Sequence, residues 1–237
     1  MLGEWKAFDP EQVRKDFDRI SALPAYETDG NASYHRHLLQ HTPARFNRAL
    51  DVGCGTGTFT RLLADRAARV DAIDLSPGMI EAARRNLLGR SNVRFEVADL
   101  LETHLEPDRY DVIATLATLH HVPLELALNR LVAALAPGGT LLVLDLLDAT
   151  GFKELPRNGF AWLALRLKRL AQGRPLVPAD AERAWNDHGR RDRYDPWPEI
   201  IRTYRRLLPG TRLKRHLLWR YSAVWRKPPL TSSASRA

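Results

Sequence analysis

Residues 50–58 read Leu-Asp-Val-Gly-Cys-Gly-Thr-Gly-Thr, and this stretch decides the fold that we expect. The apolar residues before the first glycine are typical of a buried strand, and a helical pattern starts at Thr58. Between them Gly53, Gly55 and Gly57 stand at alternate positions. Because glycine has no Cβ, such a backbone can turn sharply and offer N–H groups to a ligand. A strand, a glycine turn and a helix are typical of the start of a nucleotide-type site.

The chain after this turn continues to alternate apolar runs with helical patterns. This alternation predicts an α/β protein with a doubly wound parallel sheet and right-handed crossovers. The last predicted strand is apolar almost throughout, as expected for a strand buried on both faces. The predicted strands are Arg48–Val52, Arg69–Asp74, Val93–Val97, Tyr110–Leu116 and Thr140–Leu147. The predicted helices are Thr58–Arg66, a helix that Ser76-Pro77 begins and that runs to about Leu88, and Pro123–Leu135, which Pro137-Gly138-Gly139 ends.

Two further helices are predicted before the sheet. Val13, Phe17 and Ile20 recur at helical spacing between Pro10 and Ser21, and a second helix follows Asn31. Together they form an N-terminal helical cap.

The pattern changes after Asp148. We expect a basic amphipathic helix over Phe160–Leu170, a loop from Asn186 to Trp197, a helix over Glu199–Leu208, and one or two strands within Arg212–Lys227. The prediction is therefore one domain over residues 1–237, with a cap (1–45), a core (46–147), a variable helical lid (148–198), a C-terminal helix and strands (199–228), and a tail (229–237).

Composition excludes several classes of protein. Hydrophobic residues make up 44% of the chain, enough for a substantial core. The longest apolar stretch, residues 141–144, is too short to span a bilayer, and the N-terminus lacks the pattern of a secretory signal. The single cysteine excludes a disulfide framework and a Cys-rich zinc site. We therefore expect a cytoplasmic protein with no transmembrane segment, and the sequence predicts no metal site.

The net charge of +8 and the isoelectric point near 10.0 leave two interpretations open. One is a polyanionic partner such as nucleic acid. The other, which we favour, is a solvated arginine-rich surface, because acidic residues are dispersed among the basic ones.

Polar residues stand where the predicted strands end. In a doubly wound sheet, the ligand lies beyond the carboxyl ends of the strands. The second strand ends in Asp74, whose carboxylate could accept both hydroxyls of a ribose, and the third is followed by Asp99, which could bind an adenine amino group. The fourth opens into a segment that contains His120 and His121. A helix-capping role for Asp74 and a turn role for Asp99 are the structural alternatives.

These motifs together resemble the class I S-adenosylmethionine-dependent methyltransferases. The resemblance covers about residues 48–147 and is closest to the small-molecule methyltransferases. It is carried by LDVGCGTG (residues 50–57), IDLS (73–76), AD (98–99), YDVIATLATLHHV (110–122) and LAPGG (135–139). It implies a Rossmann-like seven-stranded sheet, mostly parallel with an antiparallel C-terminal strand, and a helical insertion after the fifth strand.

The resemblance also implies a role for each matched residue. S-adenosylmethionine is the implied cofactor, with its methionyl part wrapped by the glycine turn, its ribose on Asp74, and its adenine between apolar side chains and beside Asp99. The implied cofactor-binding residues are Gly53, Cys54, Gly55, Gly57, Asp74, Leu75, Met79, Asp99, Leu100 and Leu116. Cys54 then serves as a small turn residue rather than a nucleophile.

The acceptor side of the site is less constrained. His120 and His121 lie beside the point where the methyl group must emerge, and either could deprotonate a hydroxyl or orient an amine. Their structural alternative is packing. Tyr34 and His35 in the cap could contact the cofactor. The basic helix over Phe160–Leu170 could cover the substrate pocket or rest on a membrane surface.

Three other functions are weighed against methyl transfer to a small molecule. A nicotinamide dehydrogenase would have a third fingerprint glycine at position 58, where this chain has Thr58. An RNA or tRNA methyltransferase stays open because of the basic charge, although no appended RNA-binding module is visible. A non-catalytic S-adenosylmethionine-binding protein is the third. The sequence names neither the acceptor nor the attacked atom (O, N or C), and it allows a monomer or a homodimer.

Overall fold

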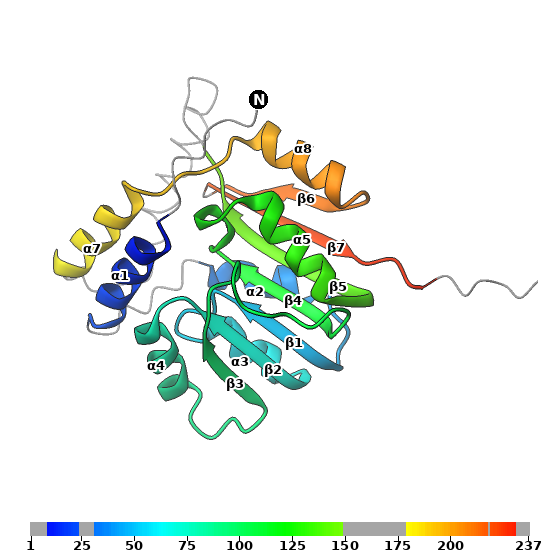
Figure 1. Cartoon of the computed structure of the whole chain (residues 1–237), viewed down its shortest axis with the longest axis horizontal. Helices are drawn as coiled ribbons and strands as arrows, with labels where there is room; N and C mark the ends of the chain where they lie inside the picture. The colour runs from blue at the N-terminus through cyan, green and yellow to red at the C-terminus, as the bar shows by residue number, and fades with distance from the viewer. Residues whose placement is uncertain (1–8, 24–30, 149–178, 218, 231–237) are drawn as a thin grey trace, which may run out of the picture.

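Seven strands in the described part of the chain form one sheet, in the order β3-β2-β1-β4-β5-β7-β6 (Figure 1). The computed structural model describes residues 9–23, 31–148, 179–217 and 219–230. The strands from β3 to β5 are parallel, and β7 is antiparallel to both of its neighbours, so the expected fold class is confirmed. The strands are β1 (Phe46–Val52), β2 (Ala67–Asp74), β3 (Val93–Val97), β4 (Tyr110–Leu116), β5 (Leu135–Leu146), β6 (Arg212–Arg215) and β7 (Arg220–Arg226).

Helices cover both faces of the sheet because the central strands are apolar on both sides. In β5, Leu141 and Val143 belong to the apolar cluster beneath α5 and α8, whereas Leu142 and Leu144 belong to the cluster beneath α2 and α3. The helices are α1 (Pro10–Ser21), α2 (Ala32–Leu39), α3 (Thr58–Ala64), α4 (Pro77–Asn86), α5 (Leu124–Ala134), α7 (Ala179–Gly189) and α8 (Trp197–Leu207), with the 3₁₀ helix η1 (Leu119–His121) after β4. None of the helices in the described part of the chain is long and apolar enough to cross a membrane.

Helix α1 joins two distant parts of the chain. It lies beside α7 and against α4, away from the sheet (Figure 1). Ile20, Met79 and Ala184, one from each helix, form a small buried apolar cluster. The Asp18 carboxylate of α1 accepts hydrogen bonds from the Ser76 hydroxyl (2.6 Å) and the Gly78 N–H (3.1 Å) at the start of α4. The cap is therefore fixed beside the end of β2.

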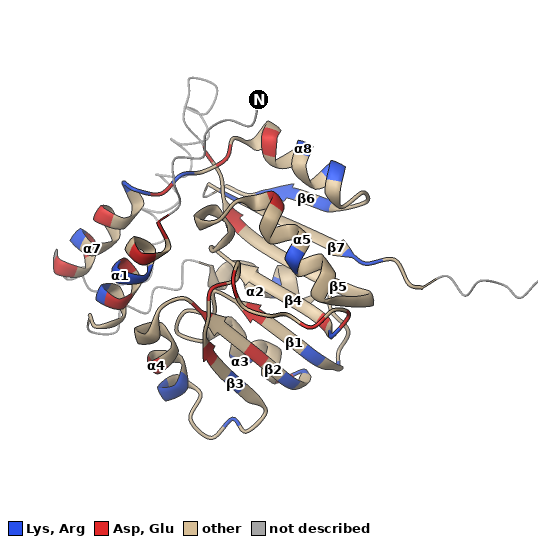
Figure 2. Ribbon diagram, in the orientation of Figure 1, with Lys and Arg blue, Asp and Glu red and all other residues tan. Residues whose placement is uncertain are grey.

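Charges of both signs line the contact between α1 and α7 (Figure 2). Arg191, which follows α7, holds Asp16 of α1 at 2.6 Å, and Arg19 of α1 lies 3.6 Å from Asp187. Exposed pairs of this kind contribute little individually. They complement the buried apolar cluster in setting how the two helices meet.

Two boundaries differ from the sequence predictions. The Pro137-Gly138-Gly139 turn lies within β5, because Gly138 and Gly139 exchange backbone hydrogen bonds with Lys227 and a register shift absorbs the extra residues opposite β4. The predicted loop from Asn186 is wrong in its first residues, since α7 continues to Gly189. The buried residues Ala181, Ala184 and His188 supply the tertiary packing that extends the helix. The predicted helix over Phe160–Leu170 lies outside the described residues.

Candidate active site

The glycine turn is compressed between the end of β4 and helix α4. Gly53 has a φ of +67°, and a Cβ at this position would lie 2.1 Å from Thr118 Oγ1. Gly57 has a φ of +82°, and a Cβ there would lie 2.7 Å from Leu87 Cδ1. Both the left-handed backbone and the close approach exclude a larger side chain. The turn is thus specified by its neighbours as well as by its own flexibility.

Asp74 closes over this turn from the end of β2. One carboxylate oxygen accepts the Gly55 N–H at 2.8 Å, and the other accepts the Ser76 N–H at 2.9 Å. Burial raises the pKa of Asp74, against the effect of these hydrogen bonds and with a further contribution from the Asp18 charge. An ionised carboxylate offers about four acceptor positions, so these bonds leave acceptor capacity for a hydroxyl group of a ligand. The capping role and the ribose-binding role are therefore compatible.

Asp51, which is not among the predicted site residues, is a buried carboxylate beneath the turn. It is only 2% exposed in β1, two residues before the turn, and accepts a hydrogen bond of 2.6 Å from the Thr60 hydroxyl. Burial raises the pKa of Asp51 to about 6, with a smaller contribution from the Asp74 charge. The available sequence signal was an acidic residue in an otherwise apolar strand.

The residues expected around adenine lie on both sides of the strand ends. Asp99 follows β3, and its carboxylate accepts the Leu101 N–H at 2.7 Å, which is the turn role considered above. Leu100 is buried in the core, and Leu75 is half-buried after β2. Met79 packs between α1 and α7 in the small apolar cluster. Met79 and Leu100 thus belong to two different apolar clusters, and their role around adenine stays a prediction.

Cys54 and Leu116 complete the expected cofactor residues. Cys54 is buried against Ala72 and Ile80, and burial raises the pKa of its thiol well above the ordinary value. A protonated, enclosed thiol fits a packing role. Leu116 ends β4 and is followed by Ala117, whose φ of +55° turns the chain toward Thr118 and the glycine turn.

His120 is held by a buried carboxylate of the neighbouring strand. Its Nδ1 lies 2.6 Å from Asp145 Oδ1, and the two side chains are 5% and 2% exposed. Burial lowers the pKa of His120, but the Asp145 charge and hydrogen bond prevail and the net shift is upward. When Nδ1–H of the neutral ring donates to the Asp145 carboxylate, Nε2 keeps its lone pair.

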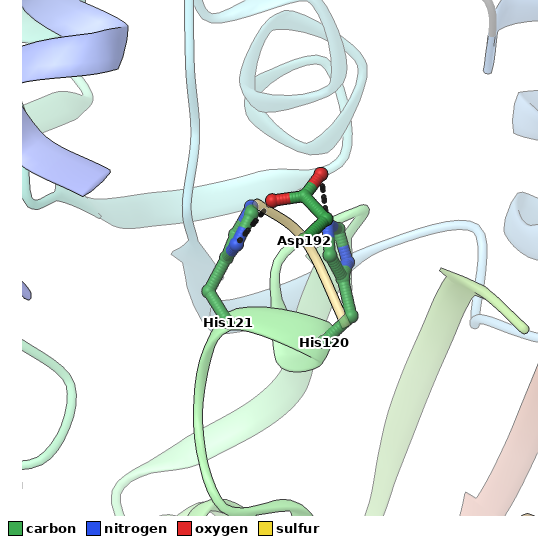
Figure 3. Close-up of side chains that lie close together, drawn as sticks. All are labelled: His120, His121 and Asp192. Atoms are coloured by element: carbon green, nitrogen blue, oxygen red, sulfur yellow. Dashed lines mark ion pairs between the residues drawn. The ribbon is translucent and has the colours of Figure 1, made fainter. Parts of the chain in front are cut away.

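His121 and His120 both face Asp192, which follows α7 (Figure 3). His121 Nδ1 lies 3.5 Å from Asp192 Oδ1, and His120 Nε2 lies 3.8 Å from Asp192 Oδ2. A third histidine, His188 of α7, places Nε2 3.5 Å from Asp192 Oδ2. Burial and the charges of His120 and His188 lower the pKa of His121 well below its ordinary value. The structure therefore brings the predicted histidine pair together with two residues that the sequence analysis left unassigned.

Tyr34 and His35 point to different surroundings. The Tyr34 ring lies 4.8 Å from the ring of His216, beside the C-terminal strands. His35 is buried with its ring 5.0 Å from that of Phe59 in α3. His35 is therefore the member of the pair that packs against the helix after the glycine turn.

Two surface hollows in the described part of the chain lie elsewhere. One is lined by residues at the amino ends of the strands, including Arg45, Arg66 and Arg226, and the other by residues of β2 and the loop before β4. Neither is lined by the glycine turn. The site is consequently assigned from backbone conformation and polar contacts.

Comparison with known proteins identifies the family. A family model described as a methyltransferase domain matches residues 49–139. An uncharacterised methyltransferase from Mycobacterium tuberculosis is 28% identical over 208 residues, which cover 84% of this chain and 97% of that protein. A ubiquinone biosynthesis O-methyltransferase from Idiomarina loihiensis is 30% identical over 175 residues, covering 68% of this chain and 67% of that protein.

Solved structures agree at the level of the fold. The N-methyltransferase NodS from Bradyrhizobium japonicum, in complex with S-adenosyl-L-homocysteine, superposes with a TM-score of 0.63 at 18% sequence identity, covering 91% of this chain and 98% of that chain. Residues 49–139, which the methyltransferase family model matches, contain the glycine turn, Asp74, Asp99 and the histidine pair. The chain belongs to the class I S-adenosylmethionine-dependent methyltransferases.

Proposed function

We propose that the protein transfers a methyl group from S-adenosylmethionine to a small-molecule acceptor. The observation that carries the proposal is a pair of carboxylates, the buried Asp51 and the half-buried Asp74, around a glycine turn whose conformation is fixed on both sides. Burial raises the pKa of both, and the Asp74 charge further raises that of Asp51, so a cationic ligand is favoured there. S-adenosylmethionine brings both a sulfonium and an ammonium group.

The donor would lie across the carboxyl ends of β1, β2 and β3. The remaining acceptor capacity of Asp74 suits the ribose. Asp99 would accept from the adenine amino group, between Leu75 and Leu100. The methionyl part would follow the glycine turn toward the Leu116 backbone. This arrangement directs the methyl group toward the exit of β4.

Methyl transfer is an in-line displacement. The acceptor atom forms a bond to the methyl carbon as the carbon–sulfur bond breaks, and S-adenosylhomocysteine leaves as a neutral thioether while a protonated acceptor releases its proton. Alignment and exclusion of water are the main tasks of the protein. The buried side chains of Leu119 and Val122, in the segment that follows β4, would help to exclude water.

His120 and His121 are proposed to position the acceptor end of the site. The nitrogens of His120 face Asp145 and Asp192, and Nδ1 of His121 faces Asp192. Both side chains are over nine-tenths buried, at 5% and 8% exposure. This geometry favours a positioning role over proton removal, which the sequence analysis had considered. Positioning predicts that His120→Ala raises KM with a smaller change in kcat, whereas a general base predicts a loss in kcat and an altered pH profile.

A screen with labelled donor tests the function. Small-molecule extracts are incubated with the protein and S-adenosylmethionine labelled in its methyl group, and the products are separated by size and chemistry. The expected result is label in one class of small molecule, absent with Asp74→Ala. Label in RNA, or none in any extract although the donor binds, would contradict the proposal.

A free, buried cysteine is compatible with the cytoplasm, where we propose the protein acts.

A further inference from the structure

Three histidines and one aspartate from distant parts of the chain meet in a buried cluster. His120 and His121 come from η1, whereas His188 and Asp192 come from the end of α7 and the residues after it. Their side chains are only 5%, 8%, 5% and 7% exposed, respectively. We infer that this His120–His121–His188–Asp192 cluster binds a divalent transition-metal ion such as Zn²⁺.

The separations between the facing atoms suit a shared ion. His121 Nδ1 and His188 Nε2 each lie 3.5 Å from an Asp192 oxygen, and His120 Nε2 lies at 3.8 Å. These contacts are longer than ordinary hydrogen bonds. Ligands about 2.1 Å from a tetrahedral Zn²⁺ are separated from one another by about 3.4 Å. Candidate ligand atoms of His120, His121 and Asp192 all lie within 4.8 Å of one another, so binding needs only a modest contraction.

In His120 and His188, the ring nitrogen that points away from the proposed ion faces a carboxylate, as in known metal sites. His120 Nδ1 is 2.6 Å from Asp145, and His188 Nδ1 is 3.2 Å from Asp16. A histidine that ligates a metal commonly donates its other N–H to a carboxylate, which fixes the tautomer with its lone pair toward the ion. Two such carboxylates behind two converging rings are more than packing requires. Tyr194 also fixes Asp192, since its hydroxyl donates to Oδ2 at 3.0 Å.

The loose contact between His121 and Asp192 also supports the inference. His121 Nδ1 is enclosed in the cluster and faces Asp192 Oδ1 at 3.5 Å, a distance beyond a good hydrogen bond. Buried polar atoms of this kind need an explanation. The edge of the Phe17 ring packs against His121 and His188, with ring centroids 5.6 Å and 4.6 Å away, and encloses the cluster. A metal ligated by Nδ1 accounts for the orientation of His121.

The donor set selects the class of ion. Three imidazoles and one carboxylate suit Zn²⁺, Co²⁺, Ni²⁺ or Cu²⁺, whereas Mg²⁺ and Ca²⁺ prefer oxygen ligands. Four protein ligands make a closed tetrahedral site, which in zinc proteins is structural. The ion would tie α7 and the residues after it to the exit of β4, at the acceptor end of the proposed active site. The sequence predicted no metal because the two halves of the ligand set, His120-His121 and His188 with Asp192, lie far apart in the chain.

Cobalt substitution tests the inference with a readout that is independent of methyl transfer. The full-length protein is freed of metal with a chelator and titrated with Co²⁺, and the visible spectrum is recorded. One Co²⁺ per chain, intense tetrahedral absorption bands and displacement by Zn²⁺ are expected. Asp192→Asn and His188→Ala should each weaken binding by about tenfold or more, and Asp145→Asn by about 10- to 100-fold. His104→Ala, which alters an exposed histidine outside the cluster, should bind as the unmodified protein does.

Circular dichroism shows whether each variant is folded. If a variant is unfolded, the inference is tested by the visible spectrum and the Co²⁺ stoichiometry of the unmodified protein alone. No stoichiometric Co²⁺ binding by that protein, or binding by folded Asp192→Asn and His188→Ala as tight as its own, would overturn the inference in favour of a metal-free hydrogen-bonded cluster. S-adenosylmethionine binding is measured separately by calorimetry. If the protein binds S-adenosylmethionine but no metal, only the metal site is refuted. If it binds metal but no S-adenosylmethionine, only the proposed function is refuted.

Discussion

Replacing Asp51 with asparagine should stabilise the protein at neutral pH and weaken cofactor binding. Asp51 is 2% exposed and receives the Thr60 hydroxyl hydrogen bond at 2.6 Å. The asparagine side chain has nearly the same shape, and its carbonyl oxygen can accept the same bond. The substitution therefore removes the buried charge with little change in packing.

The magnitude follows from the pKa of Asp51, which burial raises to about 6 from an ordinary value of 3.8. Between these values the folded chain retains a proton that the unfolded chain has released, so the free energy of unfolding falls as the pH rises and levels off above about pH 6. The difference between the two pKa values of Asp51 corresponds to about 3 kcal/mol in the free energy of unfolding. The asparagine side chain of the variant does not titrate. The stability of Asp51→Asn relative to the unmodified protein should therefore rise by up to about 3 kcal/mol between acidic and neutral pH.

Urea unfolding at several values between about pH 4 and pH 7.5 measures this difference. Glu81→Gln is the control, because the Glu81 side chain is 71% exposed and forms a long surface ion pair of 3.9 Å with Arg85. A stability difference between Asp51→Asn and the unmodified protein that stays constant over this range would refute the electrostatic reasoning. If the variant binds S-adenosylmethionine as tightly as the unmodified protein, Asp51 does not favour a cationic ligand.

Two substitutions test the packing around the site. Gly53→Ala forces a left-handed alanine toward Thr118 and should destabilise the protein by about 2 kcal/mol or more, with part of the loss recovered by Thr118→Ala in the same chain, as urea midpoints will show. Equal stability of Gly53→Ala and the unmodified protein would contradict the close approach. Asp18→Ala removes the acceptor for Ser76 and Gly78 and should cost about 1 kcal/mol, whereas Asp18→Asn, which keeps an acceptor oxygen, should cost less. If both Asp18 variants cost the same, the contact between α1 and α4 does not depend on these hydrogen bonds.

The sheet was predictable because its signals are local. Val93–Val97 and Tyr110–Leu116 agree with the observed strands, and Ser76 caps α4 as expected, with its hydroxyl oxygen accepting the Met79 N–H at 3.1 Å. Apolar runs and capping chemistry are contained in a few consecutive residues. Helix α7 was not predicted, since it is stabilised by contacts with α1 that are distant in the chain, such as that between His188 and Asp16.

The candidate site likewise has residues that local sequence predicts and residues that only tertiary packing brings together. The glycine turn, Asp74 and Asp99 stand at strand ends, so the order of the sheet brings them together. Asp145 interrupts an apolar strand, which was a usable signal, but its partner His120 is 25 residues away. His188 and Asp192 have the spacing of one helical turn, yet nothing local connects them with η1. Their meeting depends on how α7 packs on α1.

Calorimetric titration of the protein with S-adenosylmethionine and NAD tests the central claim most directly. Asp74→Asn is compared with Asp111→Asn, whose carboxylate also accepts backbone N–H groups, from Asn47 and Arg48, at the opposite ends of the strands. We predict that the unmodified protein and Asp111→Asn bind S-adenosylmethionine and not NAD, and that Asp74→Asn binds it about tenfold or more weakly, the loss expected when hydrogen bonds to a charged group are removed. No binding of S-adenosylmethionine by the folded, unmodified protein, or equal affinity of both variants, would contradict the account.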